Sequence, residues 1–283
     1  MPSWPGQAAK PCTEPGDRTA PVLNDKQSRE MRQGRDPIGL DPRHGVAGLD
    51  LPQQMFFVLS DTPCPYLPGR REKKLITEID ERDPNRTYSA LSRAGFRRSH
   101  HFAYRPACNA CRACVPVRIP VGRFAPSRSQ RRVLRANADL SARELSHIAS
   151  IEQYNLFARY IASRHGDGEM AGMTLVDYRS MVHHSRIDSR LTEFRDPDGH
   201  LVAVCLIDWL DDGPSAVYSF FDPTLSARSL GTYMILWLIE ETRRRSLAHV
   251  YLGYWIAESP KMSYKLKFQP LEALGGEGWK TLA

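Results

Sequence analysis

The sequence lacks several features that define well-known classes of protein. None of its 283 residues lies in an apolar run near the roughly eighteen residues that a membrane-spanning helix needs. The start does not follow the charged, apolar and small-residue order of a secretory signal, and no Gly-x-x-x-x-Gly-Lys loop for nucleotide phosphates occurs. We therefore expect a cytoplasmic protein with no membrane or DNA partner, whose chemistry uses a substrate activated elsewhere.

A disulfide framework is also not expected. The chain has six cysteines and no export signal, which argues against a disulfide framework. Three of the six nevertheless fall within one seven-residue window, from Cys108 to Cys114. The charge balance of 39 basic against 32 acidic residues leaves a surplus of +7, which favours an anionic partner.

The composition divides the chain into three parts. Residues 1–48 contain seven prolines, six glycines and one aromatic residue, Trp4, so we predict a disordered extension. Residues 49–125 are predicted to form a small α+β domain with a helix capped by Asn85, and they contain the clustered cysteines. Residues 126–283 are predicted to form a larger α/β domain.

The larger domain is predicted to contain helices first and a meander of strands afterwards. Apolar spacing predicts helices over 151–161 and 174–184. Strands are expected over 191–195 and 201–209, joined by the Asp-Pro-Asp-Gly turn that begins at Asp196.

A strand–turn–helix–strand order then occupies residues 216–256. An aromatic strand ends before Pro223, Ser226 is the predicted N-cap of the helix, and a last strand begins at His249. This order resembles the carrier-binding segment of GNAT acyltransferases, although Tyr233 replaces the third small residue of that motif. The predicted fold class is therefore α/β, with a GNAT-like C-terminal layer and a small cysteine-containing N-terminal α+β domain.

A basic helix is predicted to begin at Ser127. Its arginines recur at three- and four-residue spacing and repel one another. They form either a solvated surface face or a site for nucleic-acid phosphates. These residues are Arg128, Arg131, Arg132 and Arg135.

The cysteine cluster has the spacing of a metal site. Cys108, Cys111 and Cys114 form a C-x2-C-x2-C run, and Cys64 lies in a proline-rich loop before them. Four thiolates complete a set for a structural zinc ion or an iron–sulfur cluster. The alternative is four free thiols that pack as small apolar groups. Cys205, on an apolar strand, is expected to be plain core.

Several motifs occur together in one order. They are Cys64-Pro-Tyr-Leu-Pro, Gly95-Phe-Arg-Arg-Ser, the cysteine run, Ser127-Arg-Ser-Gln-Arg-Arg, Phe220-Phe-Asp-Pro, Ser229-Leu-Gly-Thr, Tyr251-Leu-Gly-Tyr-Trp-Ile and Met262-x-Tyr-Lys. From about residue 54 onward, the chain resembles the bacterial aspartate/glutamate leucyltransferases, relatives of the eukaryotic arginyl-tRNA-protein transferases. The resemblance implies transfer of leucine from Leu-tRNA to the N-terminal amine of proteins beginning with Asp or Glu. Such transfer creates an N-degron and requires no cofactor.

Three residues are predicted to act on the amine. Asp222, at the end of the central strand, is the first choice as a base or as the group that orients the amine, although Asp-Pro also commonly ends a strand. Glu193 and Tyr254 are the second choices. Backbone amides around the next helix start are expected to hold the developing oxyanion or the terminal ribose and phosphate. They belong to Ser229, Leu230, Gly231 and Thr232.

An acidic acceptor needs a cationic partner, for which a guanidinium is best suited. The predicted candidates are Arg97, Arg98 and Lys265. Apolar walls such as Phe220, Phe221 and Trp255 suit a leucyl group. Three nearby carboxylates leave arginyl transfer open, namely Asp208, Asp211 and Asp212.

Two further functions remain open from the sequence. A coenzyme A-dependent N-acetyltransferase keeps the fold and changes the donor. The other is a non-catalytic adaptor, in which the basic helix would bind RNA and the cysteines would hold a metal.

Overall fold

The computed structural model describes residues 54–59, 61–146, 148–164 and 169–282. The predicted disordered extension, residues 1–48, lies outside these ranges. In the part of the chain that the structure describes, no helix is long and apolar enough to cross a membrane.

A large mixed sheet forms the centre of the fold, with the strand order β14-β13-β7-β12-β11-β10-β9-β8. Its neighbours pair antiparallel except β11 and β12, which are parallel. The strands are β7 (Val115–Pro120), β8 (Ser141–Ser146), β9 (Ser189–Arg195), β10 (Leu201–Leu210), β11 (Gly213–Phe221), β12 (His249–Trp255), β13 (Glu272–Gly275) and β14 (Gly278–Thr281).

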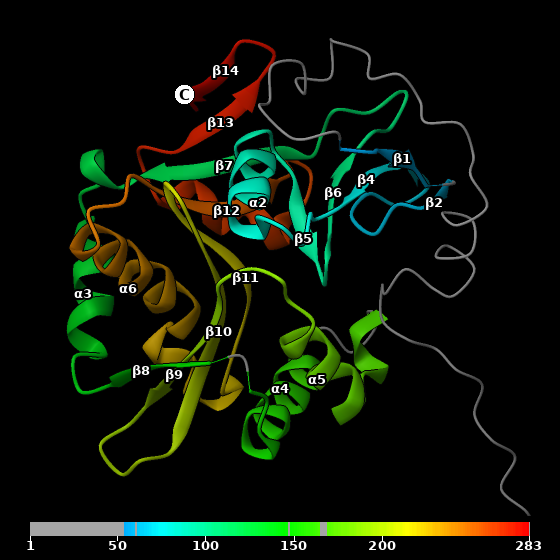
Figure 1. Cartoon of the computed structure of the whole chain (residues 1–283). Helices are drawn as coiled ribbons and strands as arrows, with labels where there is room; N and C mark the ends of the chain where they lie inside the picture. Colours follow the sequence, from blue (N-terminus) through cyan, green and yellow to red (C-terminus); the bar gives the residue numbers. More distant parts are fainter. Residues whose placement is uncertain (1–53, 60, 147, 165–168, 283) are drawn as a thin grey trace, which may run out of the picture.

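A smaller sheet, of order β1-β4-β6-β5, lies beside the large one (Figure 1). Its strands are β1 (Phe57–Val58), β4 (Lys74–Glu78), β5 (Arg97–Ser99) and β6 (Phe102–Pro106). A two-stranded ribbon, β2 (Thr62–Pro63) with β3 (Arg71–Glu72), precedes β4.

Helices cover both faces of the large sheet. The α-helices are α2 (Pro84–Arg93), α3 (Arg128–Ala136), α4 (Ile151–Arg164), α5 (Leu175–His183) and α6 (Leu230–Arg244). Short 3-10 segments are η2 (Val121–Arg123), η3 (Glu169–Gly172), η4 (Pro223–Arg228) and η5 (Pro260–Lys267).

Alternation along β10 explains the layers, because successive side chains of a strand point to opposite faces. Cys205 and Ile207 share one buried cluster with the apolar stripe of α6. Val204 and Leu206 share another with α4 and α5. Leu210, further along that second face, packs with α2 and the smaller sheet. Every residue of β10 is therefore buried.

The α/β fold class and the strand–helix–strand order of residues 216–256 are confirmed. The predicted N-cap was wrong, however. Ser226 lies inside η4, and Ser229, in a left-handed conformation with φ 53°, is the residue before α6. Asn85 is likewise inside α2, which Asp83 caps through its side chain.

The strand after the cysteines joins the larger sheet. β7 falls within the predicted 49–125 domain, yet it pairs with β12 and β13. Strand β8, which the sequence reasoning did not predict, extends the opposite edge beside β9. The division at residues 125 and 126 stays a prediction.

Candidate functional site

The parallel strands β11 and β12 are joined at a single registered pair, Ser215 with Tyr251. Beyond it, the carbonyls of Ala216 and Val217 accept hydrogen bonds from Nη2 of Arg97, at 3.4 and 3.1 Å. Arg97 comes from β5 of the smaller sheet. Its guanidinium therefore takes the place of strand pairing in a gap at the centre of the large sheet.

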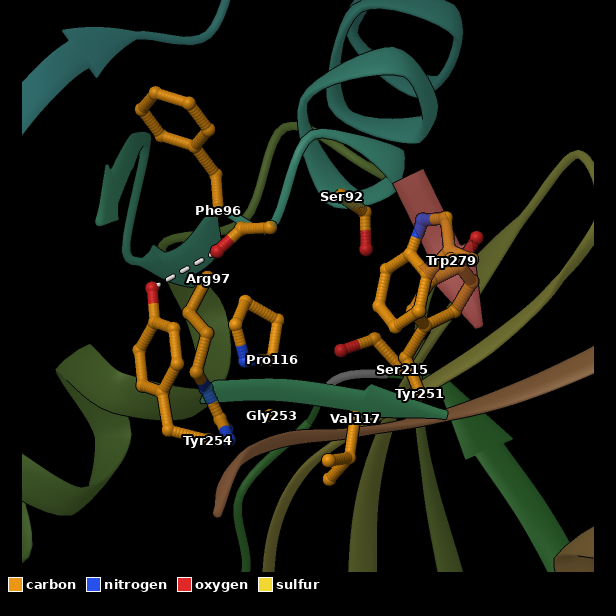
Figure 2. A pocket seen from close by; sticks show the side chains of 11 residues that line it. Ser92, Phe96, Arg97, Pro116, Val117, Ser215, Tyr251, Gly253, Tyr254 and Trp279 are labelled. Atoms are coloured by element: carbon orange, nitrogen blue, oxygen red, sulfur yellow. Dashed lines mark hydrogen bonds between the residues drawn. The ribbon is translucent and has the colours of Figure 1, made fainter. Parts of the chain in front are cut away.

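Glycine at position 253 makes room for this guanidinium. A Cβ atom built on Gly253 would lie 1.5 Å from Nη1 of Arg97, and the residue has φ +72°, which side chains rarely adopt. Figure 2 shows the Arg97 side chain running down to Gly253 between Tyr254 and Pro116. Gly253 and Arg97 are thus a fitted pair.

Arg97 also lines a narrow pocket of about 10 Å³, room for about one water molecule (Figure 2). Gly95, Gly253, Tyr254 and Pro116 form the wall around the guanidinium. The pocket continues past Ser215 and Tyr251 to Trp279.

Tyr254 holds the two sheets together rather than presenting a free hydroxyl. Its side chain is buried, and its hydroxyl lies 3.0 Å from the carbonyl oxygen of Gly95 and 3.2 Å from that of Tyr104. Burial raises the pKa of Tyr254 well above its ordinary value. These contacts favour a positioning role over proton transfer.

Lys265 contacts the backbone of Tyr254. The residue is 5% exposed, and its Nζ donates a hydrogen bond to the carbonyl of Tyr254. Burial, and secondarily the charge of Arg97, lowers the pKa of Lys265 to about 7. Two cations therefore converge on the backbone of Gly253 and Tyr254.

Arg98, a second predicted acceptor residue, is already paired. Its Nε and Nη2 each lie 2.8 Å from a carboxylate oxygen of Asp208, and both side chains are almost completely buried. Asp208 also accepts a hydrogen bond from Ser189 at 2.6 Å. The fork of Arg98 is therefore satisfied within the protein.

Glu193 and Asp222 each contact a residue of α4, whereas the Tyr254 hydroxyl contacts backbone carbonyls after α2 and in β6. Glu193 is buried and accepts hydrogen bonds from Gln153 at 2.8 Å and from Nη2 of Arg195 at 2.8 Å. Both of its oxygens are engaged. The structure thus does not bring the three predicted catalytic residues together.

Asp222 is the more accessible of the two carboxylates. It accepts hydrogen bonds from the backbone and hydroxyl of Thr224, and it lies 3.5 Å from Nη2 of Arg159. Burial raises the pKa of Asp222, but the Thr224 hydrogen bonds and the Arg159 charge outweigh it and leave the pKa below its ordinary value. A carboxylate in this setting suits the orientation of a cation better than the removal of a proton.

Helix α6 begins at Leu230, after the 3-10 segment η4 that Asp222 caps. The first N–H groups of a helix have no intrahelical partner, and the side chain of Ser229 makes no capping hydrogen bond. The amides of Leu230 and Gly231 are therefore available, while those of Thr232 and Tyr233 bond to the Ser229 carbonyl at 3.0 Å. A Cβ on Gly231 would lie 3.2 Å from the ring of Phe221, so this glycine also permits close packing.

The predicted basic helix exists, and its arginines are exposed. Ser127 caps α3 through a capping box with Gln130. The helix packs beside α6, and its arginine side chains point to solvent. The exposed residues are Arg128, Arg131, Arg132 and Arg135.

The four cysteines lie near one another as free thiols. Burial first, and then the neighbouring thiols of Cys64, Cys108 and Cys111, raises the pKa of Cys114 to about 12. They are not gathered to metal-ligand distance. Among the residues that the structure describes, three possible metal-ligand atoms of His, Cys, Asp or Glu lie within 4.8 Å of one another only at Asp196, Asp198 and His200, in a hairpin at the surface. The fifth described cysteine, Cys205, is buried in the core as expected.

Two residues of the site escaped the sequence reasoning, Gly253 and Arg159. A glycine inside a strand often marks a close backbone approach, so Gly253 carried a usable signal. Arg159 had no recognisable sequence signal, because its partner Asp222 is distant in the sequence. Phe220, predicted as a wall for the leucyl group, is 1% exposed and packs in the core under α4.

Comparisons with known proteins place the chain in a family. Residues 62–132 match the family model described as arginine-tRNA-protein transferase, N terminus, and residues 152–275 match the C terminus model. The aspartate/glutamate leucyltransferase of Paramagnetospirillum magneticum is 57% identical over 228 residues, which cover 81% of this chain and 93% of that protein. The chain belongs to the aspartate/glutamate leucyltransferase family.

Another leucyltransferase, from Rhodospirillum rubrum, is 54% identical over 225 residues, which cover 79% of this chain and 92% of that protein. As a member of this leucyltransferase family, the chain is an enzyme, an aminoacyltransferase. One solved structure, a GCN5-related glucosamine N-acetyltransferase region of a fungal protein, covers 72% of this chain and 22% of its own, at 9% identity and a TM-score of 0.36. That likeness is too distant to bear on function.

Proposed function

We propose that this leucyltransferase family member moves leucine from Leu-tRNA to the α-amino group of proteins that begin with Asp or Glu, in the cytoplasm. The observation that carries the proposal is the 57% identity to a protein named aspartate/glutamate leucyltransferase, over 93% of that protein's length. The amine attacks the ester carbonyl, the C–N bond forms, and the 3'-oxygen of the tRNA leaves with a proton. An N-degron results.

The donor ester is already activated, so the protein's task is to position the reactants. A free α-amine has a pKa near 8, so roughly a tenth of it is neutral at pH 7 and little base strength is needed. Asp222 orients the amine, and the free amides of Leu230 and Gly231 stabilise the oxyanion of the tetrahedral intermediate. The exposed arginines of α3 contact tRNA phosphates.

An arginyl group would need a free carboxylate in the protein. Two of the carboxylates that the sequence offered are already engaged, which favours leucyl transfer. Asp208 is buried in its pair with Arg98. Asp212 accepts a hydrogen bond from the hydroxyl of Tyr251 at 2.8 Å and lies 3.2 Å from Nδ1 of His249. An arginyl guanidinium would therefore have to compete with Arg98 at Asp208, and with Tyr251 and His249 for one oxygen of Asp212; the third carboxylate, Asp211, is half-exposed and lies 4.0 Å from Nη1 of Arg93.

The test is transfer of labelled leucine from Leu-tRNA to matched peptides that begin with Asp, Asn or Ala. We expect a leucyl product from the Asp peptide and at least tenfold less from the other two. Arg-tRNA and acetyl-coenzyme A replace the donor in parallel reactions. Equal labelling of all three peptides, or activity with acetyl-coenzyme A alone, would reject the proposal.

The four cysteines fit a structural metal by their chemistry, since thiolates hold zinc or an iron–sulfur cluster. We propose that Cys64, Cys108, Cys111 and Cys114 close around such a group, which would stabilise the corner of the smaller sheet. No step of the transfer uses it.

A further inference from the structure

Two cations near the centre of the large sheet are not neutralised by any carboxylate of the described residues. Burying a cation without an anionic partner is costly, so such a group marks a place where a ligand completes the pair. Lys265, which is buried, and Arg97, which is part-buried, are two such groups. Within the described ranges, no carboxylate lies within 4.0 Å of either cation, whereas the neighbouring Arg98 is fully paired with Asp208.

Both cations also have donors to spare. Arg97 uses Nη2 on two strand carbonyls, and no described residue accepts from its Nε or Nη1. Lys265 directs Nζ to one acceptor, the carbonyl of Tyr254. A carboxylate is the ligand that matches a guanidinium edge and an ammonium group together.

The surroundings hold the two cations in place. Gly253 leaves the space in which the Arg97 guanidinium lies, and the side chain of Tyr254 is fixed by the carbonyls of Gly95 and Tyr104. Arg97 borders the narrow pocket of Figure 2, and the exposed Tyr264 flanks Lys265 in η5. Arg97 thus comes from a strand and Lys265 from a 3-10 segment, and both cations are held by hydrogen bonds to backbone carbonyls of the large sheet.

We propose that Arg97 and Lys265 together bind the side-chain carboxylate of the acceptor's N-terminal Asp or Glu. The inference rests on the proposed function and deepens it, because it assigns acceptor specificity to two of the three cations that the sequence offered. A neutral N-terminal residue would leave the part-buried Arg97 and the buried Lys265 without an anionic partner, so we expect discrimination against Asn and Ala. The donor's phosphates are instead bound by α3.

The experiment compares Lys265→Met, which keeps the length of the side chain and removes the charge, with wild type. We expect the KM for an Asp peptide to rise at least tenfold, with kcat at saturating peptide and the KM for Leu-tRNA within about twofold. The exposed Lys267 of the same η5 segment supplies the control, and Lys267→Met is expected to leave the peptide KM unchanged. Arg131→Ala in α3 gives the opposite pattern, a raised KM for Leu-tRNA alone.

Arg97→Gln is the second variant, because an amide still donates to the strand carbonyls, and a thermal melt establishes that it folds. It is expected to raise the peptide KM as Lys265→Met does. An unchanged peptide KM in Lys265→Met overturns the assignment, as does a raised KM for Leu-tRNA, which would make the site a phosphate site. A collapse of kcat with unchanged KM would make Lys265 a proton acceptor instead. If wild type fails to label the Asp peptide, the proposed function itself is wrong.

Discussion

The ammonium group of Lys265 changes charge near neutral pH, because burial and the adjacent Arg97 lower its pKa to about 7. Below that pH the group is protonated and attracts a carboxylate; above it the group becomes neutral. Acceptor affinity is therefore expected to fall as pH rises. The same rise in pH frees the acceptor amine, so kcat and KM respond separately.

We predict that the KM for an Asp peptide rises between pH 6 and pH 8.5, approaching about tenfold per pH unit above 7. Steady-state kinetics with saturating Leu-tRNA at each pH measures the effect. Lys265→Arg keeps its charge throughout, so its KM should stay flat over this range. Parallel pH profiles for the two proteins would show that another group is responsible.

The residues of the site differ in how far the sequence revealed them. Arg97, Arg98 and Lys265 stood out because each is a cation in a short motif. The local sequence does not distinguish the role of Arg97 from that of Arg98, however. Alternation in β5 directs Arg97 towards Gly253 and Arg98 towards Asp208. Their different roles depend on strands more than a hundred residues away, so sequence alone could not assign them.

At the scale of elements, the helix preceded by Ser229 shows where local patterns fail. Apolar spacing correctly predicted α6, but Ser226 is an equally good cap by composition. The structure starts the helix at Leu230 because η4 ends at Arg228 and Ser229 turns into the left-handed region. That turn leaves the first amides of α6 uncapped, as the proposed oxyanion site requires.

The metal content of the protein tests the proposed role of Cys64, Cys108, Cys111 and Cys114. We predict one structural zinc ion or one iron–sulfur cluster per chain after anaerobic purification, measured by elemental analysis and absorption spectroscopy. Cys111→Ser should remove the group and lower the melting temperature. The buried Cys205 is the matched control, and Cys205→Ala should keep the group. Less than about a tenth of an equivalent of zinc or iron per wild-type chain would mean that the four cysteines are free thiols and hold no metal.

At the scale of the whole molecule, the two sheets are joined by contacts that no single segment of sequence contains. Tyr254 of β12 reaches the carbonyls of Gly95 and Tyr104, and Arg97 reaches those of β11. β7 continues the chain from the cysteines into the large sheet. The α/β class and the order of elements followed from the sequence, whereas this joint depends on long-range pairing that apolar periodicity does not encode.

The buried ion pair of Arg98 in β5 and Asp208 in β10 also links the smaller sheet to the larger one. Removing this pair tests how strongly the two sheets are joined. Arg98→Met would leave the Asp208 carboxylate buried with the hydroxyl of Ser189, so we expect a loss of about 3–5 kcal/mol in the free energy of unfolding. The double variant Arg98→Met/Asp208→Leu removes both charges and should recover most of the loss. Urea denaturation followed by tryptophan fluorescence and circular dichroism measures both variants.

Coincident transitions in the two signals would mean that both sheets unfold as one cooperative unit. This matters for function because the proposed carboxylate site exists only while the sheets remain docked. Arg97 comes from the smaller sheet, whereas Gly253 and Tyr254 come from the larger one. Arg98→Met should therefore raise the peptide KM at temperatures below the global melt. If its KM stays at the wild-type value while stability falls by 3 kcal/mol or more, the joint and the acceptor site are independent.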